Sequence, residues 1–276
     1  MTVYTSAVSE FAAYLRGFDP EARVEDARAD DIRGWLMALL DAGNVATTVN
    51  KKLSGLKNFY RFLKYRGCPA PNPAARVEGP KRGKPLPCYV REGDMERLLD
   101  GAIDAQDFEA VRDRMLMEML YSTGMRLGEL LGLRDGDVDG SARLLRVTGK
   151  RDKQRLIPYG PLLARHMDAY CALRDSRTDA ARESGGAFFV RKSGKPLTRA
   201  NIYRIVKAQL SGIAALKKRS PHVLRHTFAT ALLNHGAELN AVQALLGHES
   251  LGTTQIYTHA TFEELRKVYN QAHPRA

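Results

Sequence analysis

The feature that most constrains the fold is a proline-rich stretch, "GCPAPNPAARVEGPKRGKPLP" (67–87), which carries six prolines and four basic residues. Proline has no backbone N–H and a fixed φ, so such a run interrupts both helices and strands. We therefore predict an extended, solvated segment that separates two domains. The predicted boundaries are an N-terminal domain over residues 1–80, a linker over 81–88 and a C-terminal domain over 89–276.

Before this stretch, the chain is predicted to form a small helical bundle. Apolar residues recur at the three- and four-residue spacing of amphipathic helices in three segments. These segments are 6–18, 29–43 and 46–67. In the third segment, basic residues also recur between the apolar positions, which predicts one basic face. We predict that this face binds DNA through Lys51, Lys52 and Lys57.

After the stretch, the chain is predicted to be mainly α with a small antiparallel β-sheet. Residues 93–103 and 107–124 have the pattern of amphipathic helices, and a further helix is expected at 198–210. Two β-rich runs joined by a charged turn, "LLRVTGKRDKQRLIPY" (144–159), predict a hairpin, and a short strand is expected at "AFFV" (187–190). The predicted fold class is therefore a two-domain, mainly helical protein.

The charge balance indicates a polyanionic partner. Lys and Arg number 43 against 31 Asp and Glu, a net charge of +12, which nucleic acid or an anionic membrane would both suit. No apolar run is long enough to span a bilayer and the first residues lack a signal-peptide pattern, so we expect a cytoplasmic protein without a membrane partner. The cysteines Cys68, Cys88 and Cys171 fit neither a disulfide framework nor a zinc motif. No metal or cofactor is predicted.

The stretch "SPHVLRHTFATALLNHG" (220–236) is predicted to be a helix with an anion site at its start. Ser220 suits the N-cap and Pro221 the first helical position. His222 and Arg225 then share one face, beside backbone N–H groups that have no partner within the helix. Such a helix start attracts a phosphate. A His-x-x-Arg pair alone is weak support, because most such matches are ordinary cap or surface residues.

Other candidate groups lie on either side of this helix. In "STGMRLGELLGL", Arg126 begins an apolar helix after a glycine-containing turn, and Glu129 could hold it in place; a surface ion pair is the ordinary alternative. In the charged turn of the predicted hairpin, Lys150 is the candidate reactive amine. Its neighbours Arg151 and Lys153 are predicted to bind DNA, although solvation is the simpler interpretation.

The segment "LLGHESLGTTQIYTHA" (245–260) adds two more candidates. His248 follows a helix stop at Gly247, and Tyr257 lies in the next helical stretch. A tyrosine taken at random is far more often a packing or interface residue than a catalytic one. Position alone therefore does not assign a role to Tyr257.

In their order along the chain, the six candidates resemble the catalytic pattern of the tyrosine recombinase (phage integrase) family, in its bacterial Xer branch. They are Arg126, Lys150, His222, Arg225, His248 and Tyr257. The flanking strings "TGMRLGELLGL", "PHVLRHTFATALL", "LLGHES" and "IYTH" agree as well, and "LSGLKNFYRFL" is similar to the N-terminal helices of that branch. The resemblance implies a SAM-like core-binding domain followed by a tyrosine recombinase catalytic domain.

The resemblance also implies a role for each group. Tyr257 would attack DNA and form a 3′-phosphotyrosyl intermediate, while the two arginines hold the phosphate oxygens. Lys150 would protonate the leaving 5′ oxygen, His222 would accept the tyrosine proton, and His248 would donate a further hydrogen bond. The intermediate keeps the energy of the phosphodiester, so neither ATP nor a metal ion is required.

The implied partner is a recombination site in double-stranded DNA. Exchange between two duplexes through a Holliday junction implies a tetramer on two DNA duplexes, made with itself or with a second Xer-type recombinase, and a DNA translocase is a further candidate partner. The C-terminal tail over 262–276 is expected to dock on a neighbouring protomer. The expected role is chromosome dimer resolution at cell division.

Four alternatives remain open at this point. An integron, transposon or phage-type integrase would share the chemistry, and so would a type IB topoisomerase-like enzyme, which the Xer-like tail disfavours. A non-catalytic DNA-binding regulator would explain the charge but leaves Lys150 and Tyr257 without a role. A zinc enzyme could use His222 and His226, four residues apart, but H-E-x-x-H is absent and nearby arginines would repel a metal ion.

Overall fold

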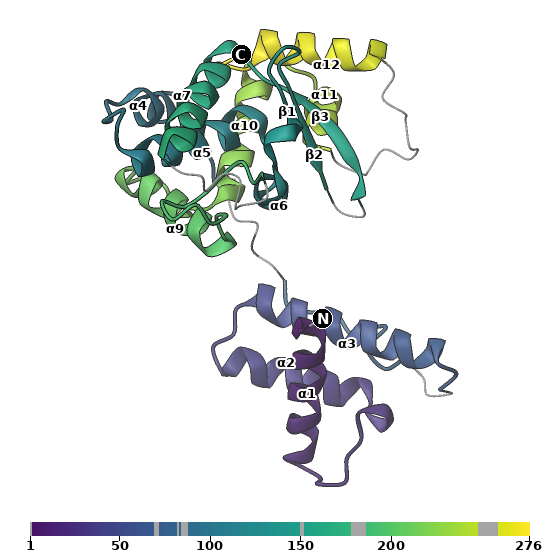
Figure 1. Cartoon of the computed structure of the whole chain (residues 1–276). Helices are drawn as coiled ribbons and strands as arrows, with labels where there is room; N and C mark the ends of the chain where they lie inside the picture. The colour runs from purple at the N-terminus through teal and green to yellow at the C-terminus, as the bar shows by residue number, and fades with distance from the viewer. Residues whose placement is uncertain are drawn as a thin grey trace. The chain divides into compact units, whose positions relative to one another are not determined.

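The computed structural model describes residues 2–68, 72–81, 83, 88–149, 152–177, 186–247 and 259–276. The chain divides into two compact units, Met1–Leu86 and Pro87–Ala276 (Figure 1). Both units are mainly helical, and the second contains a three-stranded antiparallel sheet, which confirms the predicted fold class. In the described parts of the chain, no helix is long and apolar enough to cross a membrane. The predicted linker over 81–88 stays a prediction.

The N-terminal unit is built from α1 (Thr2–Arg16), α2 (Ala29–Asp41) and α3 (Ala46–Tyr65). One apolar face of each helix meets the others in a common core, where Phe11 and Trp35 are buried with ring centroids 5.1 Å apart. The three helices correspond to the three segments of helical spacing in the sequence.

Residues 72–80 differ from the prediction of a solvated segment. Ala74 and Val77 are fully buried in the core of the N-terminal unit. The side chain of Asn50 on α3 donates a hydrogen bond to the carbonyl of Pro80 at 2.9 Å. The prolines do prevent regular structure here, but the small apolar residues between them still bury their surface against α3. This part of the stretch belongs to the N-terminal unit.

The C-terminal unit carries the remaining elements. Its helices are α4 (Glu92–Asp100), α5 (Phe108–Thr123), α6 (Leu127–Gly132), α7 (Pro161–Arg177), α9 (Arg199–Gln209), α10 (Pro221–Asn234), α11 (Leu239–Leu246) and α12 (His259–Ala272). Helix α5 is buried along most of its length and contacts both α7 and α10 (Figure 1). Helix α5 is therefore the central element of this unit.

The sheet of the C-terminal unit has the order β1-β2-β3, with β1 (Val138–Asp139), β2 (Leu144–Thr148) and β3 (Gln154–Pro158). Strands β2 and β3 pair in antiparallel register, with Val147 opposite Arg155, and form the predicted hairpin.

The strand predicted at residues 187–190 is not formed. Two isolated bridges occur there instead, between Arg134 and Ala187 and between Val190 and Pro196. Pro196 cannot donate to a ladder, and the two phenylalanines of this segment pack on the ring of Tyr170. The apolar residues of "AFFV" therefore serve the core without extending the sheet.

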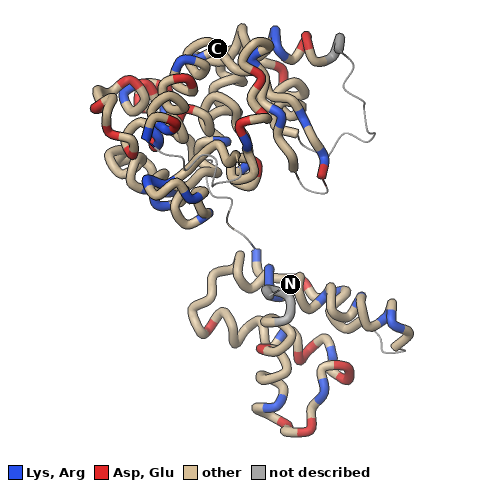
Figure 2. Tube along the Cα trace, in the orientation of Figure 1, with Lys and Arg blue, Asp and Glu red and all other residues tan. Residues whose placement is uncertain are grey.

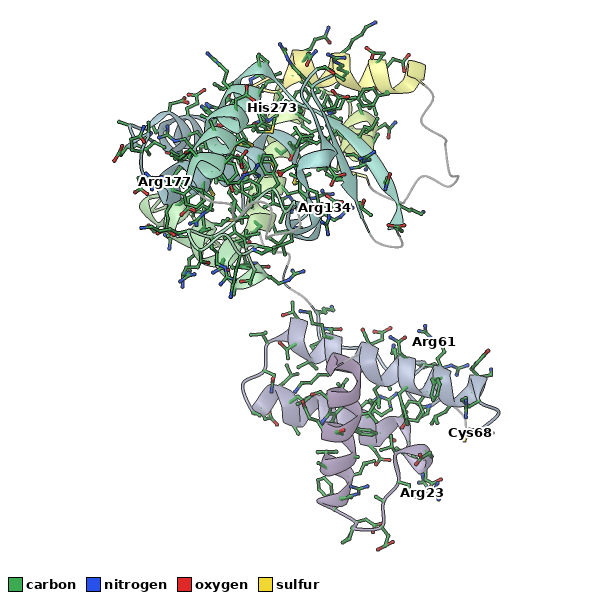
Figure 3. All side chains as sticks on the ribbon, viewed as in Figure 1. Arg23, Arg61, Cys68, Arg134, Arg177 and His273 are labelled. Carbon is green, nitrogen blue, oxygen red and sulfur yellow. The ribbon has the colours of Figure 1, made fainter. Side chains whose placement is uncertain are left out.

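The C-terminal tail packs on the C-terminal unit of its own chain, and its docking on a neighbouring protomer stays a prediction. Leu265 and Tyr269 of α12 are buried against Phe228 of α10 and Val242 of α11. His273, labelled in Figure 3, stacks on Tyr269 with ring centroids 5.2 Å apart. Burial lowers the pKa of His273 to about 4, so the ring is neutral at physiological pH. The apolar face of α12 is thus satisfied within one chain.

Arg275 anchors the end of this tail. Its Nε donates to the fully buried carboxylate of Glu118 at 2.7 Å, and its two terminal nitrogens donate to Asp100 at 3.1 and 3.0 Å. We expect Arg275→Met to lower the free energy of unfolding by about 3–5 kcal/mol, because the buried carboxylate of Glu118 would lose its arginine and keep only Ser122 and His166 nearby. Asp100→Asn should cost about 1 kcal/mol or less, since Asp100 is 58% exposed. Urea denaturation measures both, and equal losses would contradict this account.

Candidate active site

The turn between α5 and α6 sets the position of Arg126. Gly124 ends α5 with φ +57°, and a Cβ there would lie 2.4 Å from the ring of Phe228. Only glycine fits this left-handed conformation so close to α10. Arg126 follows as the N-cap residue of α6. The chain thus presents Arg126 at the start of a helix, as predicted.

Glu129 holds Arg126 in place. The buried carboxylate accepts a hydrogen bond from the backbone N–H of Arg126 at 2.6 Å and a second from its Nη1 at 2.9 Å. The Arg126 side chain is nevertheless 42% exposed, so part of its guanidinium faces solvent. The ordinary surface ion pair is excluded, because Glu129 itself is buried and has further partners.

The β2–β3 hairpin meets the same carboxylate. Arg155 on β3 donates from both terminal nitrogens to the two oxygens of Glu129. A Cβ on Gly149 would lie 3.5 Å from Glu129 Oε1, so the backbone just before Lys150 also passes close to this group. The start of the hairpin turn therefore lies beside the Arg126–Glu129 pair.

Helix α10 contributes the second predicted arginine. Ser220 is the N-cap and Pro221 the first residue of this helix, as predicted, although the Ser220 side chain makes no capping hydrogen bond. Arg225 is buried and donates to the carbonyls of Gly124 at 2.6 Å and Leu246 at 2.7 Å. These contacts tie α10 to the α5–α6 turn on one side and to the end of α11 on the other.

Three guanidinium groups converge on the C-terminal end of α11. Arg155 Nε donates to the carbonyl of Leu245 at 3.3 Å, Arg225 to that of Leu246, and Arg126 to that of Gly247 at 2.9 Å. The last carbonyls of a helix lack partners within it and carry partial negative charge, so cations are favourable there. The arginines thus fix the residue that directly precedes His248 in the sequence.

The cluster carries more positive than negative charge. Burial and the charges of Arg126 and Arg155 lower the pKa of Arg225 to about 10. Burial would raise the pKa of Glu129, but hydrogen bonds from Arg155 and Arg126 bring it below its ordinary value. Arg225 stays protonated at neutral pH, and repulsion from Arg126 and Arg155 adds to the larger effect of burial on its pKa. An anion bound at this position would relieve that repulsion.

His222 lies one turn before Arg225 and is exposed at the start of α10. Burial, His226 and Arg225 lower the pKa of its imidazole, so the neutral form predominates at neutral pH. A neutral imidazole has a nitrogen able to accept a proton. The ring of His226 lies 5.2 Å from that of His222, and no metal-binding group of three or more ligands occurs among the described residues.

Four of the predicted site residues lie outside the described residues. They are Lys150, Arg151, His248 and Tyr257. Their roles stay predictions. Of their described neighbours, Gly247 accepts a hydrogen bond from Arg126, and the backbone of Gly149 lies close to Glu129.

The three lysines predicted to bind DNA on α3 have different surroundings. Lys51 is exposed, whereas Lys52 forms an ion pair with Glu10 of α1 and Lys57 reaches the carbonyl of Ala75 at 3.5 Å. Lys153, on the hairpin, is exposed. Figure 2 shows Lys and Arg along α3.

An exposed stripe on α3 is a stronger candidate surface than the three lysines together. We name it the α3 stripe, and its members recur at helical spacing: Lys51, Ser54, Asn58, Arg61 and Tyr65. Tyr65 is 88% exposed. A basic helix face with an exposed aromatic ring suits a polyanion better than plain solvation. The 3.6-residue spacing could have identified the stripe.

A basic pocket on α9 was missing from the predictions. It has a volume of about 550 Å³ and is lined by Tyr203, Arg204, Lys207, Ala208, Ser211 and Arg219. Figure 2 shows basic residues gathered on α9. In the sequence these residues alternate with core positions of an amphipathic helix, which made them look like an ordinary solvated face.

Comparison with known proteins identifies the class. Residues 89–264 match the phage integrase family, and residues 1–67 match the phage integrase N-terminal SAM-like domain. The chain belongs to the phage integrase family. This confirms the resemblance seen in the sequence and the predicted class of activity, a tyrosine site-specific recombinase.

Individual relatives are named more specifically. The chain is 39% identical to a tyrosine recombinase XerC of Mycobacterium sp. (strain KMS), over 99% of this chain and 92% of that protein. It is 31% identical to a tyrosine recombinase XerD of Oceanobacillus iheyensis, over 100% and 92%. The crystal structure of the XerH site-specific recombinase bound to its difH substrate shares the fold, with a TM-score of 0.69, 20% identity and coverage of 98% and 76%.

Proposed function

We propose that this recombinase cleaves DNA with Tyr257 at the arginine cluster. The phenol oxygen attacks phosphorus and forms the 3′-phosphotyrosyl bond, the bond from phosphorus to the 5′ oxygen breaks, and Lys150 supplies the proton to that oxygen. His222 takes the proton of the phenol. Rejoining reverses these steps with a 5′ hydroxyl of another strand, so atoms and protons balance without ATP or metal.

The observation that carries this proposal is the excess of positive charge in the cluster. Arg126 and Arg155 bind the carboxylate of Glu129, and Arg225 is buried near both of their guanidinium groups. Such a site suits the non-bridging oxygens of a phosphate, whose negative charge increases in the pentacoordinate transition state. His248 would donate one further hydrogen bond to the same phosphate.

Covalent trapping tests the proposed chemistry. The wild-type protein is mixed with sheared genomic DNA of its source organism in EDTA and then denatured. We expect protein-linked DNA fragments, and sequencing them would identify the recombination site. A nicked duplex of that sequence then serves as a suicide substrate. Absence of linked DNA in this assay would favour the DNA-binding regulator, and a requirement for added zinc would favour the metalloenzyme.

We propose that the partner assembly is a tetramer on two duplexes, formed with itself or with a second Xer-type recombinase. One tyrosine cuts one strand, and exchange between two duplexes cuts four. Chromosome dimer resolution at cell division is the proposed role, supported by the Xer names of the relatives. An activating DNA translocase is a further proposed partner. A role in a mobile element is the alternative to chromosome dimer resolution, and the sequence of the trapped DNA distinguishes these two roles.

The α3 stripe is proposed to contact the DNA backbone. Each phosphate contact releases a counterion, so the logarithm of affinity should fall steeply with the logarithm of salt concentration, and Arg61→Gln should reduce that slope by about one. Figure 3 shows Arg61 and Arg23 on different sides of the N-terminal unit. Arg23→Gln is the matched control, because Arg23 lies near Glu25 and Asp26. Fluorescence anisotropy measures both slopes, and equal slopes for the two variants would refute the proposed surface.

A further inference from the structure

All three nitrogens of the Arg155 guanidinium donate to protein oxygens. Its two terminal nitrogens bind the two oxygens of Glu129, one of them at 2.9 Å, and its Nε donates to the carbonyl of Leu245 at 3.3 Å. Its side chain is 9% exposed. From the sequence alone, Arg155 is only one of the charged residues of the predicted hairpin.

We propose that Arg155 is a positioning residue that locks the β2–β3 hairpin, Arg126 and the end of α11 into one geometry. This inference rests on the proposed function of the cluster. The planar guanidinium of Arg155 contacts two groups. One is the carboxylate of Glu129, which orients Arg126, and the other is the end of α11, which directly precedes His248 in the sequence. Arg155 also belongs to the hairpin whose turn carries Lys150.

Direct phosphate binding by Arg155 is disfavoured by its contacts. All three of its nitrogens donate to protein oxygens, and the carboxylate of Glu129 neutralises its charge. Arg225 instead donates to two neutral carbonyls, and Arg126 is 42% exposed. A bidentate fork to a carboxylate fixes the orientation of both partners. A lysine at this position would keep the charge but could not reproduce the fork and the third contact together.

The packing around Arg155 leaves little freedom. Gly247 has φ +67°, and a Cβ there would lie 3.0 Å from Arg155 Cδ. Arg155 also pairs with Val147 across the hairpin. The end of α11 therefore lies against the side chain, and β2 fixes the backbone that carries it, so a movement of the hairpin would be transmitted to Glu129.

Single-turnover cleavage of the trapped duplex separates positioning from folding. The amplitude of the reaction reports the fraction of active protein, and the rate constant at saturating DNA reports the geometry of the site. For Arg155→Lys we expect the rate constant to fall about 100-fold, the loss typical of a small misplacement of catalytic groups. The amplitude and the DNA affinity should stay within about threefold of wild type, because no proposed DNA contact is removed.

Three further variants make the test decisive. Arg146→Lys is the matched control, because Arg146 lies on the same hairpin, is 52% exposed and pairs with Asp137 instead of the cluster. It should cleave at the wild-type rate. A double variant tests whether Arg155 acts through Glu129. If it does, Arg155→Lys and Glu129→Gln together should slow cleavage by much less than the product of the fold-changes of the two single variants.

The outcomes are distinguishable from failure of the proposed function. No cleavage by the wild-type protein would refute the chemistry itself. Wild-type cleavage together with an Arg155→Lys rate constant within threefold of it would overturn the positioning role. Loss of fold in both Arg155→Lys and Arg155→Gln would assign Arg155 to the core and also overturn it.

Discussion

Tyr257→Phe is expected to abolish covalent capture of DNA completely while leaving DNA binding intact. The phenylalanine ring has the size of the tyrosine ring but no oxygen to attack phosphorus, so the 3′-phosphotyrosyl bond cannot form. The cations of the cluster remain in place, and the affinity for the nicked duplex should stay within about threefold of wild type. A denaturing gel of the suicide reaction measures capture, and anisotropy measures binding.

A matched control accompanies this prediction. Tyr269→Phe also removes one phenol hydroxyl, but Tyr269 is fully buried in the core formed by α10, α11 and α12. It should capture DNA as the wild type does. Capture by Tyr257→Phe, or loss of capture in both variants, would contradict the assignment of the nucleophile.

Arg225→Lys is expected to lower the rate constant of cleavage by about 100- to 1,000-fold. Lysine keeps the positive charge, but it cannot donate to the carbonyls of Gly124 and Leu246 and to a phosphate oxygen at once. The loss should appear in the rate constant at saturating DNA, because charge develops on the phosphate in the transition state. Single-turnover kinetics on the trapped duplex measures it.

Arg112→Lys provides the comparison for loss of a buried arginine. Arg112 on α5 is 5% exposed and pairs with Asp113 and Glu109. It has no contact with the arginine cluster among the described residues. Both variants should lose stability, but only Arg225→Lys should lose rate. A wild-type rate constant in Arg225→Lys would show that this guanidinium does not stabilise the transition state.

Much of the fold was predictable because its helices are amphipathic. The spacing of apolar residues and the glycine stops gave α1 to α3, α5 and α10 close to their observed bounds. The strand predicted at 187–190 was wrong because apolar, β-prone residues fit a strand and a buried loop equally well. The predicted solvation of residues 72–80 was wrong for a related reason, since proline content indicates irregular backbone but does not indicate exposure.

The site was predictable where a motif combines a helix start with a charged residue. Arg126 and Arg225 lie together as their motifs implied, and Glu129 is the partner expected for Arg126. Arg155 was missed as a site residue because a charged side chain on a short hairpin normally faces water, and its partners are 26 and 90 residues away in the sequence. Contacts of that range depend on tertiary packing that local spacing does not encode.

The three arginine contacts to the end of α11 have a consequence for protein engineering. They clamp residues 245–247 against three other elements, namely the α5–α6 turn, strand β3 and helix α10. A substitution at any one of these arginines would loosen the end of α11. Variants designed to alter strand exchange should therefore leave all three arginines in place.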